Sequence, residues 1–167
     1  MLRADAARNL HRIVEVAARV FADDPGAGMA EVAAAAGVGR ATVYRHFPTR
    51  EALVEAIRDQ ALRDAEQALA ECRLDEGSAT DALRRLCAAW LEVAERYALT
   101  QPQRERRPVL SEPLIALFER GRAGGEFSPE LPAQWMARAF GALLLAGARD
   151  GTESEVVFRT LLRGVQA

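Results

Sequence analysis

Between residues 29 and 47, two short helical segments flank Gly37, and this pattern restricts the fold more than any other stretch of the chain. Residues 29–36 form the first segment, and the second runs from about residue 40 to residue 46, before Pro48. Glycine readily adopts the left-handed backbone that ends a helix, so Gly37 predicts a sharp turn. Ala33 is small enough for two helices to cross closely, and three apolar residues can pack on a preceding helix: Val32, Val38 and Val43. This combination predicts a helix-turn-helix.

Apolar residues recur at helical spacing along almost the whole chain, and no segment alternates as a strand would. We therefore expect an all-α protein. A first helix is expected to end near residue 23. Further helices are expected over about 50–72, 78–97, 111–123 and 133–149, and a last one begins at residue 152. Residues 100–108 read as a solvated connection, and Thr152 with Glu155 predicts a capping box at the start of the last helix.

The overall charge gives no support to nucleic-acid binding. All 22 basic side chains are arginine, and 24 acidic ones bring the net charge to -2. The stretch from residue 38 to residue 50 differs, because it holds three arginines and one histidine but no acid. This stretch is therefore locally cationic, as a surface that contacts phosphates must be.

The second segment of the helix-turn-helix can present a reading face to DNA. With Val43 turned inward, Ala41 and Arg45 lie roughly opposite the core, and Thr42 and Tyr44 lie on the flanks. Seven residues give a rod of roughly 10 Å, which fits a major groove of about 12 Å. Arg45 can donate twice to guanine, and the methyl groups of Ala41 and Thr42 can meet thymine.

Three further side chains are better placed for phosphates, namely Tyr44, His46 and Arg50. Taken singly, Tyr44 and Phe47 could instead be core aromatics, and His46 could be a hydrogen-bonded residue at a helix end. The turn geometry around them favours DNA contact for Tyr44 and His46.

The stretch "MAEVAAAAGVGRATVYRHFPTREALVEAI", with "VFADDPGAG" before it, closely resembles the N-terminal DNA-binding domain of TetR/AcrR-family transcriptional regulators. The resemblance covers about fifty residues. It implies that seven residues face DNA, with the tyrosine, the histidine and the last arginine on phosphates: Arg40, Ala41, Thr42, Tyr44, Arg45, His46 and Arg50. The chain departs from the family at Gly28, where a capping threonine or serine is common, so that phosphate contact is expected to be lost or reduced to a backbone amide.

The resemblance also implies two domains and a partner for each. Residues 1–50 are expected to bind double-stranded DNA, and residues 51–167 are expected to form a helical bundle for dimerisation and for a small-molecule effector, with a helix over about 50–72 connecting the two. A two-fold dimer requires a near-palindromic operator.

Sequence physics supports dimerisation independently. The helix over 133–148 is apolar nearly all round, so the core of one domain cannot cover every face of it. We expect this helix and the last one to pack on their symmetry mates as a four-helix bundle. The residues expected at this interface are Phe140, Gly141, Leu144, Leu145, Ala148, Phe158, Leu161, Leu162 and Val165.

The effector site is less clearly marked in the sequence. Aromatic residues of the second domain could line an apolar cavity, with a polar group at its edge, or they could be ordinary core residues at helical spacing. The candidates are Trp90, Arg96, Tyr97, Phe118 and Phe140. They favour a mainly apolar or aromatic small molecule.

Several classes of function are disfavoured. Cys72 and Cys87 lack metal-ligand spacing, so neither a zinc site nor a disulfide framework is expected, and no cofactor is implied. The chain has two histidines, and neither has a plausible nucleophile with an orienting acid, so we expect no enzyme. No signal peptide is visible, and the oily run over 135–148 is too short for a bilayer, which predicts a cytoplasmic protein.

These observations together predict a homodimeric, sequence-specific transcriptional repressor that a small, mainly apolar ligand releases from a palindromic operator. The alternative is a ligand-independent DNA-binding or protein-interaction module whose C-terminal bundle only dimerises.

Overall fold

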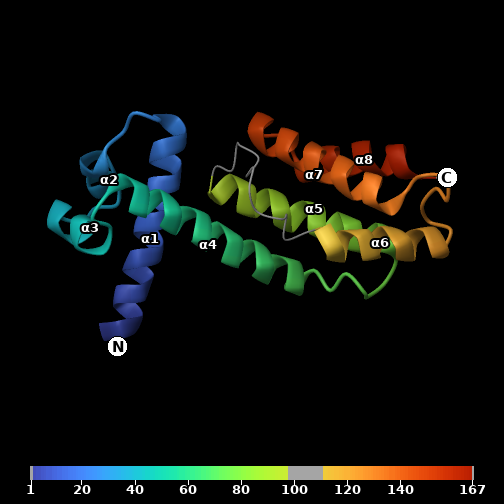
Figure 1. The fold of residues 1–167 in the computed structure, drawn as a ribbon, viewed down its shortest axis with the longest axis horizontal. Coiled ribbons are helices and arrows are strands. Elements are labelled where there is room, and N and C mark those ends of the chain that lie inside the picture. The colour runs from blue at the N-terminus through green and yellow to red at the C-terminus, as the bar shows by residue number, and fades with distance from the viewer. Residues whose placement is uncertain (1, 98–110, 167) are drawn as a thin grey trace. The chain divides into compact units, whose positions relative to one another are not determined.

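A computed structural model describes residues 2–97 and 111–166, and within these ranges the chain forms helices and no strand. The first four helices are α1 (Leu2–Asp23), α2 (Met29–Ala35), α3 (Arg40–His46) and α4 (Arg50–Glu71). The other four are α5 (Ala79–Arg96), α6 (Ser111–Ala123), α7 (Ala133–Asp150) and α8 (Ser154–Val165) (Figure 1). The all-α expectation is confirmed, and the connection expected over 100–108 lies outside the described residues.

Side chains fix where several helices begin. The Thr49 hydroxyl oxygen accepts a hydrogen bond from the Ala52 N–H at 3.1 Å, and the Ser78 hydroxyl oxygen accepts one from the Asp81 N–H at 3.0 Å. Each bond satisfies a donor that the first turn of a helix leaves open. Thr49 and Ser78 therefore cap α4 and α5.

The capping box predicted at Thr152 is wrong. Gly151 has a φ of 63° and ends α7, and the Thr152 N–H donates to the Gly147 carbonyl at 2.8 Å. Residue 152 thus still closes the end of α7, and α8 begins only after Glu153.

The chain divides into two compact units at a point inside α4, between Arg63 and Asp64. The first unit holds α1, α2, α3 and the first part of α4, together with Arg96 and Tyr97. The second holds the rest of α4, most of α5, and α6 to α8. The sequence predicts a boundary between residues 50 and 51, with the helix that is now α4 as the connection between the domains.

The first unit has its own apolar core. The inner face of α1 meets the helix-turn-helix and the start of α4 there, and each of these residues is at most 8% exposed: Ile13, Val14, Ala17, Ala18, Val32, Ala33, Val43, Phe47, Leu53 and Ile57. Burial of this apolar area favours the unit by the hydrophobic effect. It also fixes which face of α3 is left for solvent.

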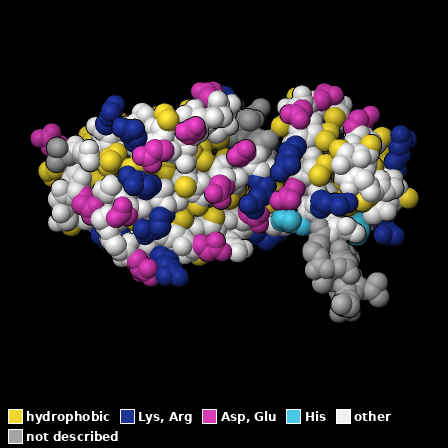
Figure 2. Space-filling view, turned by 180° about the vertical axis from the view of Figure 1, so that it is seen from behind, with side chains coloured by type: hydrophobic (Ala, Val, Ile, Leu, Met, Phe, Trp, Pro, Cys, Tyr) yellow, Lys and Arg dark blue, Asp and Glu magenta, His cyan; other side chains and the backbone are white. Residues whose placement is uncertain are grey.

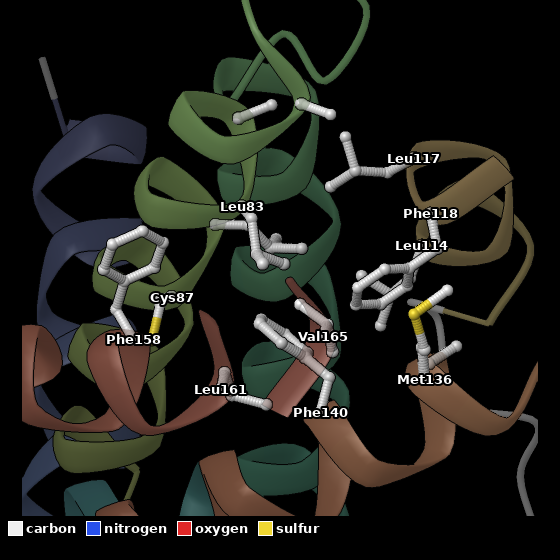
Figure 3. Packing of buried hydrophobic residues seen from close by; sticks show 14 of the residues in the cluster. Leu83, Cys87, Leu114, Leu117, Phe118, Met136, Phe140, Phe158, Leu161 and Val165 are labelled. Carbon is white, nitrogen blue, oxygen red and sulfur yellow. The ribbon is translucent and has the colours of Figure 1, made fainter. Parts of the chain in front are cut away.

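The core of the second unit contains aromatic rings from three helices, and Figure 3 shows Phe118 of α6, Phe140 of α7 and Phe158 of α8 among aliphatic side chains. Phe127 of the α6–α7 loop belongs to the same core. Phe118 lies 5.5 Å from Phe127 and 6.4 Å from Phe140 between ring centroids, and Phe158 joins them fully buried. Close helix approach completes the packing, because a Cβ at Gly147 would lie 2.5 Å from the Val157 side chain. None of the described helices is long and apolar enough to cross a membrane.

Candidate nucleic-acid interface

The turn between α2 and α3 sets the direction of α3. Gly37 has a φ of 65°, and the N–H of Val38 donates to the Ala33 carbonyl at 3.0 Å, which closes the end of α2. The Arg12 guanidinium of α1 donates to the Ala36 carbonyl at 2.8 Å, which ties the turn to α1. The turn is thus held from inside by its own backbone and from outside by an arginine.

Val43 anchors α3 with a fully buried side chain. The opposite face is open: Tyr44 is 50% exposed, Thr42 is half-buried, and the remaining predicted contacts of this helix are exposed, namely Arg40, Ala41, Arg45 and His46. Phe47 is buried, and its ring centroid lies 6.3 Å from that of His46. Tyr44 is too exposed to be a core aromatic residue. The structure therefore brings six of the seven predicted DNA contacts to one short surface helix.

Within its seven residues, α3 carries two arginines and one histidine and no acidic residue. Figure 2 shows arginine and acidic side chains interspersed over the face that it displays. Within the described residues, by contrast, no acidic side chain forms a recorded ion pair with Arg40 or Arg45. Two guanidinium groups on α3 are thus available to an anionic or hydrogen-bonding partner.

Arg50, the seventh predicted contact, lies differently. It is half-buried, and its Nε and Nη2 donate to the carbonyls of Ala27 at 3.3 Å and Pro25 at 2.9 Å. Its guanidinium also lies 4.3 Å from the centre of the Phe21 ring. Helical spacing could not predict this arrangement, because the two carbonyl groups precede Arg50 by 23 and 25 positions in the chain.

The start of α2 lacks a side-chain hydroxyl. Gly28 is the N-cap, and its N–H donates to a carboxylate oxygen of Glu31 at 3.1 Å. The Glu31 carboxylate thus fills half of a capping box.

Comparison with known proteins decides the family. The model of bacterial regulatory proteins of the tetR family matches residues 13–57, which run from α1 into α4. The HTH-type transcriptional repressor LfrR of Mycolicibacterium smegmatis is 33% identical over 159 residues, covering 86% of this chain and 81% of LfrR. The HTH-type transcriptional regulator NfxB of Pseudomonas aeruginosa is 30% identical over 140 residues, covering 77% of this chain and 75% of NfxB.

The chain belongs to the TetR family of bacterial regulators. It is therefore a DNA-binding transcriptional regulator, and its family is not one of enzymes. The crystal structure of LfrR in complex with proflavine matches with a TM-score of 0.71 and 27% identity, covering 98% of this chain and 96% of that one. The ketosteroid transcriptional regulator KstR2 of Mycobacterium tuberculosis, at a TM-score of 0.73 and 19% identity, supports the fold alone.

Among the described residues, the five candidate effector residues of this TetR-family regulator fall into two groups, one in each unit. Phe118 and Phe140 are fully buried and pack on each other, and half-buried Trp90 packs against the same core. Arg96 and Tyr97 group with the first unit, where Arg96 lies 3.6 Å from Glu15. Helical spacing identified buried aromatic rings but could not tell a packed core from a cavity wall.

The second unit does contain a hollow of about 340 Å³ between α5 and the α7–α8 connection. None of the five candidates lines it. Its lining mixes small and apolar residues with three carboxylates: Ala88, Leu91, Glu92, Glu95, Gly147, Ala148, Gly151, Thr152, Glu153 and Ser154. This hollow could not be predicted from the sequence, because its acidic residues look like ordinary solvated positions along a helix or beside a turn.

The nine residues expected at the dimer interface divide into two groups. Five are buried in the core of their own unit, because α7 and α8 turn them toward α5 and α6: Phe140, Leu144, Phe158, Leu161 and Val165. The other four are half-buried: Gly141, Leu145, Ala148 and Leu162. Only this second group can contribute to a surface for another chain.

Proposed function

We propose that the chain acts in the cytoplasm as a homodimeric repressor that reads a palindromic operator through α3 and is released by a small ligand. The observation that carries the operator contact is the exposed face of α3, with Arg45 free of a recorded acidic partner among the described residues and Val43 locked in the core. Arg45 can make the paired contact with guanine, while Tyr44 and His46 meet phosphates. The name of LfrR, a transcriptional repressor, supports repression.

The dimer proposal is supported by exposed apolar side chains and by open glycine positions on α7 and α8. Trp135 is 49% exposed and Val156 is 51% exposed, which is unusual for large apolar side chains. A Cβ at Gly141 or at Gly164 would meet nothing within 4 Å. Glycine inside a helix costs about 1 kcal/mol relative to alanine, so close approach of a second copy gives a reason for both glycines.

Two-fold symmetry then sets the form of the operator. Two copies of α3 enter successive major grooves about 34 Å apart, which requires two half-sites in inverted orientation. Selection of bound sequences from a random DNA pool tests this. We expect an inverted repeat to be enriched, and enrichment of a single unpaired half-site would count against the dimer.

The ligand proposal rests on the hollow beside α5 and on LfrR, whose structure holds proflavine. A volume of about 340 Å³ is within the range of small-molecule sites. Leu91 and Ala88 offer apolar surface, and Glu92, Glu95 and Glu153 favour a ligand with a positive charge. A mainly apolar, planar cation fits this lining.

Proflavine is therefore the first probe, measured on the protein without DNA because a planar cation can also intercalate between base pairs. We expect proflavine to raise the unfolding temperature, and the double variant Glu92→Gln with Glu153→Gln to lose that rise. Glu130→Gln, which removes an exposed carboxylate outside the hollow, is the matched control.

The complete packing of Phe118 and Phe140 favours a second candidate function, in which the C-terminal unit only dimerises and binds no effector. No rise in unfolding temperature with proflavine or with other apolar cations would leave this ligand-independent regulator as the better account.

A further inference from the structure

Arg50 connects three parts of the first unit through one guanidinium group. Two of its nitrogens donate to the carbonyls of Pro25 and Ala27, at 2.9 and 3.3 Å, and the group lies 4.3 Å from the centre of the Phe21 ring. Phe21 belongs to the last turn of α1, and the two carbonyls belong to the loop between α1 and α2. Arg50 itself is the first residue of α4.

These contacts lie at the two ends of the helix-turn-helix segment. The chain enters the segment through residues 24–28 and leaves it through residues 47–50. Arg50 thus joins the entry to the exit, and it joins both to α1. Because α3 has only seven residues, its direction depends on how these two ends are held.

The entry loop is shaped to meet this side chain. The Asp24 carboxylate accepts a hydrogen bond from the Gly26 N–H at 2.8 Å, and the Ala27 N–H donates to the Asp24 carbonyl at 3.0 Å. This tight turn leaves the Pro25 and Ala27 carbonyls to accept from Arg50, and Ala27 is buried. The next residue, Gly28, caps α2.

We infer that Arg50 is a positioning residue, which sets the place and direction of α3 by clasping the two ends of the helix-turn-helix, and that it is not a phosphate contact. The inference rests on the proposed reading of DNA by α3. Tyr44 and His46, both exposed on α3, then make the backbone contacts on this side of the segment.

Lysine cannot replace arginine in this role. A guanidinium is a flat fork that donates in two directions while its face stacks on a ring. An ammonium is a compact charge at one point, so it cannot reach both carbonyls and cover Phe21 together. For a phosphate contact, by contrast, lysine supplies the same charge.

The test compares Arg50→Ala and Arg50→Lys with wild type on the selected operator, at several salt concentrations and below the unfolding temperature of every variant. We expect equal losses of affinity in the two variants, an unchanged salt slope, and faster hydrogen exchange at residues 24–28. Arg58→Ala, which removes an exposed side chain of the same helix that pairs with Glu55, is the control and should bind as wild type does.

Two results would overturn the inference. Full affinity in Arg50→Lys, with a salt slope reduced in Arg50→Ala by about 0.9 for each protomer bound, would show a phosphate contact. A lower unfolding temperature with unchanged affinity in both variants would show a role in stability alone. If the wild-type protein enriches no operator, the proposed function fails. The positioning role of Arg50 is then tested by hydrogen exchange alone, and exchange at residues 24–28 as slow in both variants as in wild type would overturn that role.

Phe21→Leu keeps the test decisive if the Arg50 variants do not fold. This change removes the ring under the guanidinium while it leaves the charge and both carbonyl acceptors in place. We expect weaker operator binding with an unchanged salt slope and faster exchange at residues 24–28. Wild-type affinity together with wild-type exchange would overturn the clasp.

Discussion

Arg45 and Val43 lie two positions apart on α3 and face opposite ways, so one side chain is fixed by the core and the other is offered to DNA. We expect Arg45→Ala to weaken binding to the selected operator by about 1–3 kcal/mol for each half-site and to relax preference at one position of each half-site. Binding to random DNA should change much less. Competition binding measures both quantities, and an equal loss on operator and on random DNA would contradict a base contact.

Cys87 is fully buried, and its Sγ lies 3.5 Å from the Ser154 carbonyl. Burial first, and the charge of Glu155 second, raise the pKa of the Cys87 thiol to about 12, and burial also raises the pKa of Cys72. At pH 8 the thiolate, which is the reactive form, is then a very small fraction of Cys87. We expect neither cysteine to react with a disulfide reagent until the protein unfolds, and rapid labelling of the native protein would contradict this.

At the scale of helices, the start of α5 is stabilised by Ser78 and also by a residue distant in sequence, Glu126. The Glu126 carboxylate accepts hydrogen bonds from the N–H groups of Ala79 at 2.8 Å and Thr80 at 2.9 Å. Burial raises the pKa of Glu126, but the hydrogen bonds from Thr80 and Ala79 and the charge of Arg120 lower it more, so the pKa lies below its ordinary value of 4.5.

This cap makes stability depend on pH. Because the folded-state pKa of Glu126 is depressed, its stabilisation is present above pH 4.5 and is lost as pH falls through the lower folded-state pKa. Glu126→Gln should lower the free energy of unfolding by about 1 kcal/mol at pH 7 and by progressively less below pH 4. Thermal unfolding across this pH range, with Glu130→Gln as the control, checks the prediction, and an equal loss at both ends would contradict it.

The helix-turn-helix could be predicted because its constraints are local. Gly37 and Val43 act at fixed offsets within twenty residues, and the structure confirms the turn and the buried face. Contacts between distant segments could not be predicted in this way. The Glu126 cap joins residues 46 and 47 positions apart, and the acceptors of Arg50 lie in a loop that periodicity does not describe.

Phe140 of the C-terminal unit also shows that helical spacing does not predict contacts between distant segments. Helical spacing predicts that Phe140 lies on an apolar face, where it was a candidate both for the effector site and for the dimer interface. In the structure its ring packs edge-on against Phe118 inside the unit. Spacing identifies the apolar face of a helix, but only the arrangement of the other helices decides what covers that face.

At the scale of the whole molecule, the proposed function depends on a second copy, and Gly141 allows this to be tested without damage to the protomer. A Cβ at Gly141 would meet nothing within 4 Å, and arginine favours a helix over glycine by about 0.5–1 kcal/mol, so Gly141→Arg should fold as wild type does. The added bulk and charge should nevertheless keep the partner helix of the bundle away. We expect a dimer for wild type and a monomer for Gly141→Arg in sedimentation at micromolar concentration.

Loss of the dimer should also weaken binding to the operator, although Gly141 and α3 belong to different units. One copy of α3 contacts one half-site, so Gly141→Arg should bind a full operator no better than a half-site, while wild type prefers the full operator strongly. Ala116→Arg, which introduces the same arginine side chain at an exposed position of α6, should leave both the dimer and the preference for the full operator intact. A dimeric Gly141→Arg protein, or a monomeric one that still prefers the full operator, would contradict the placement of the interface on α7 and α8.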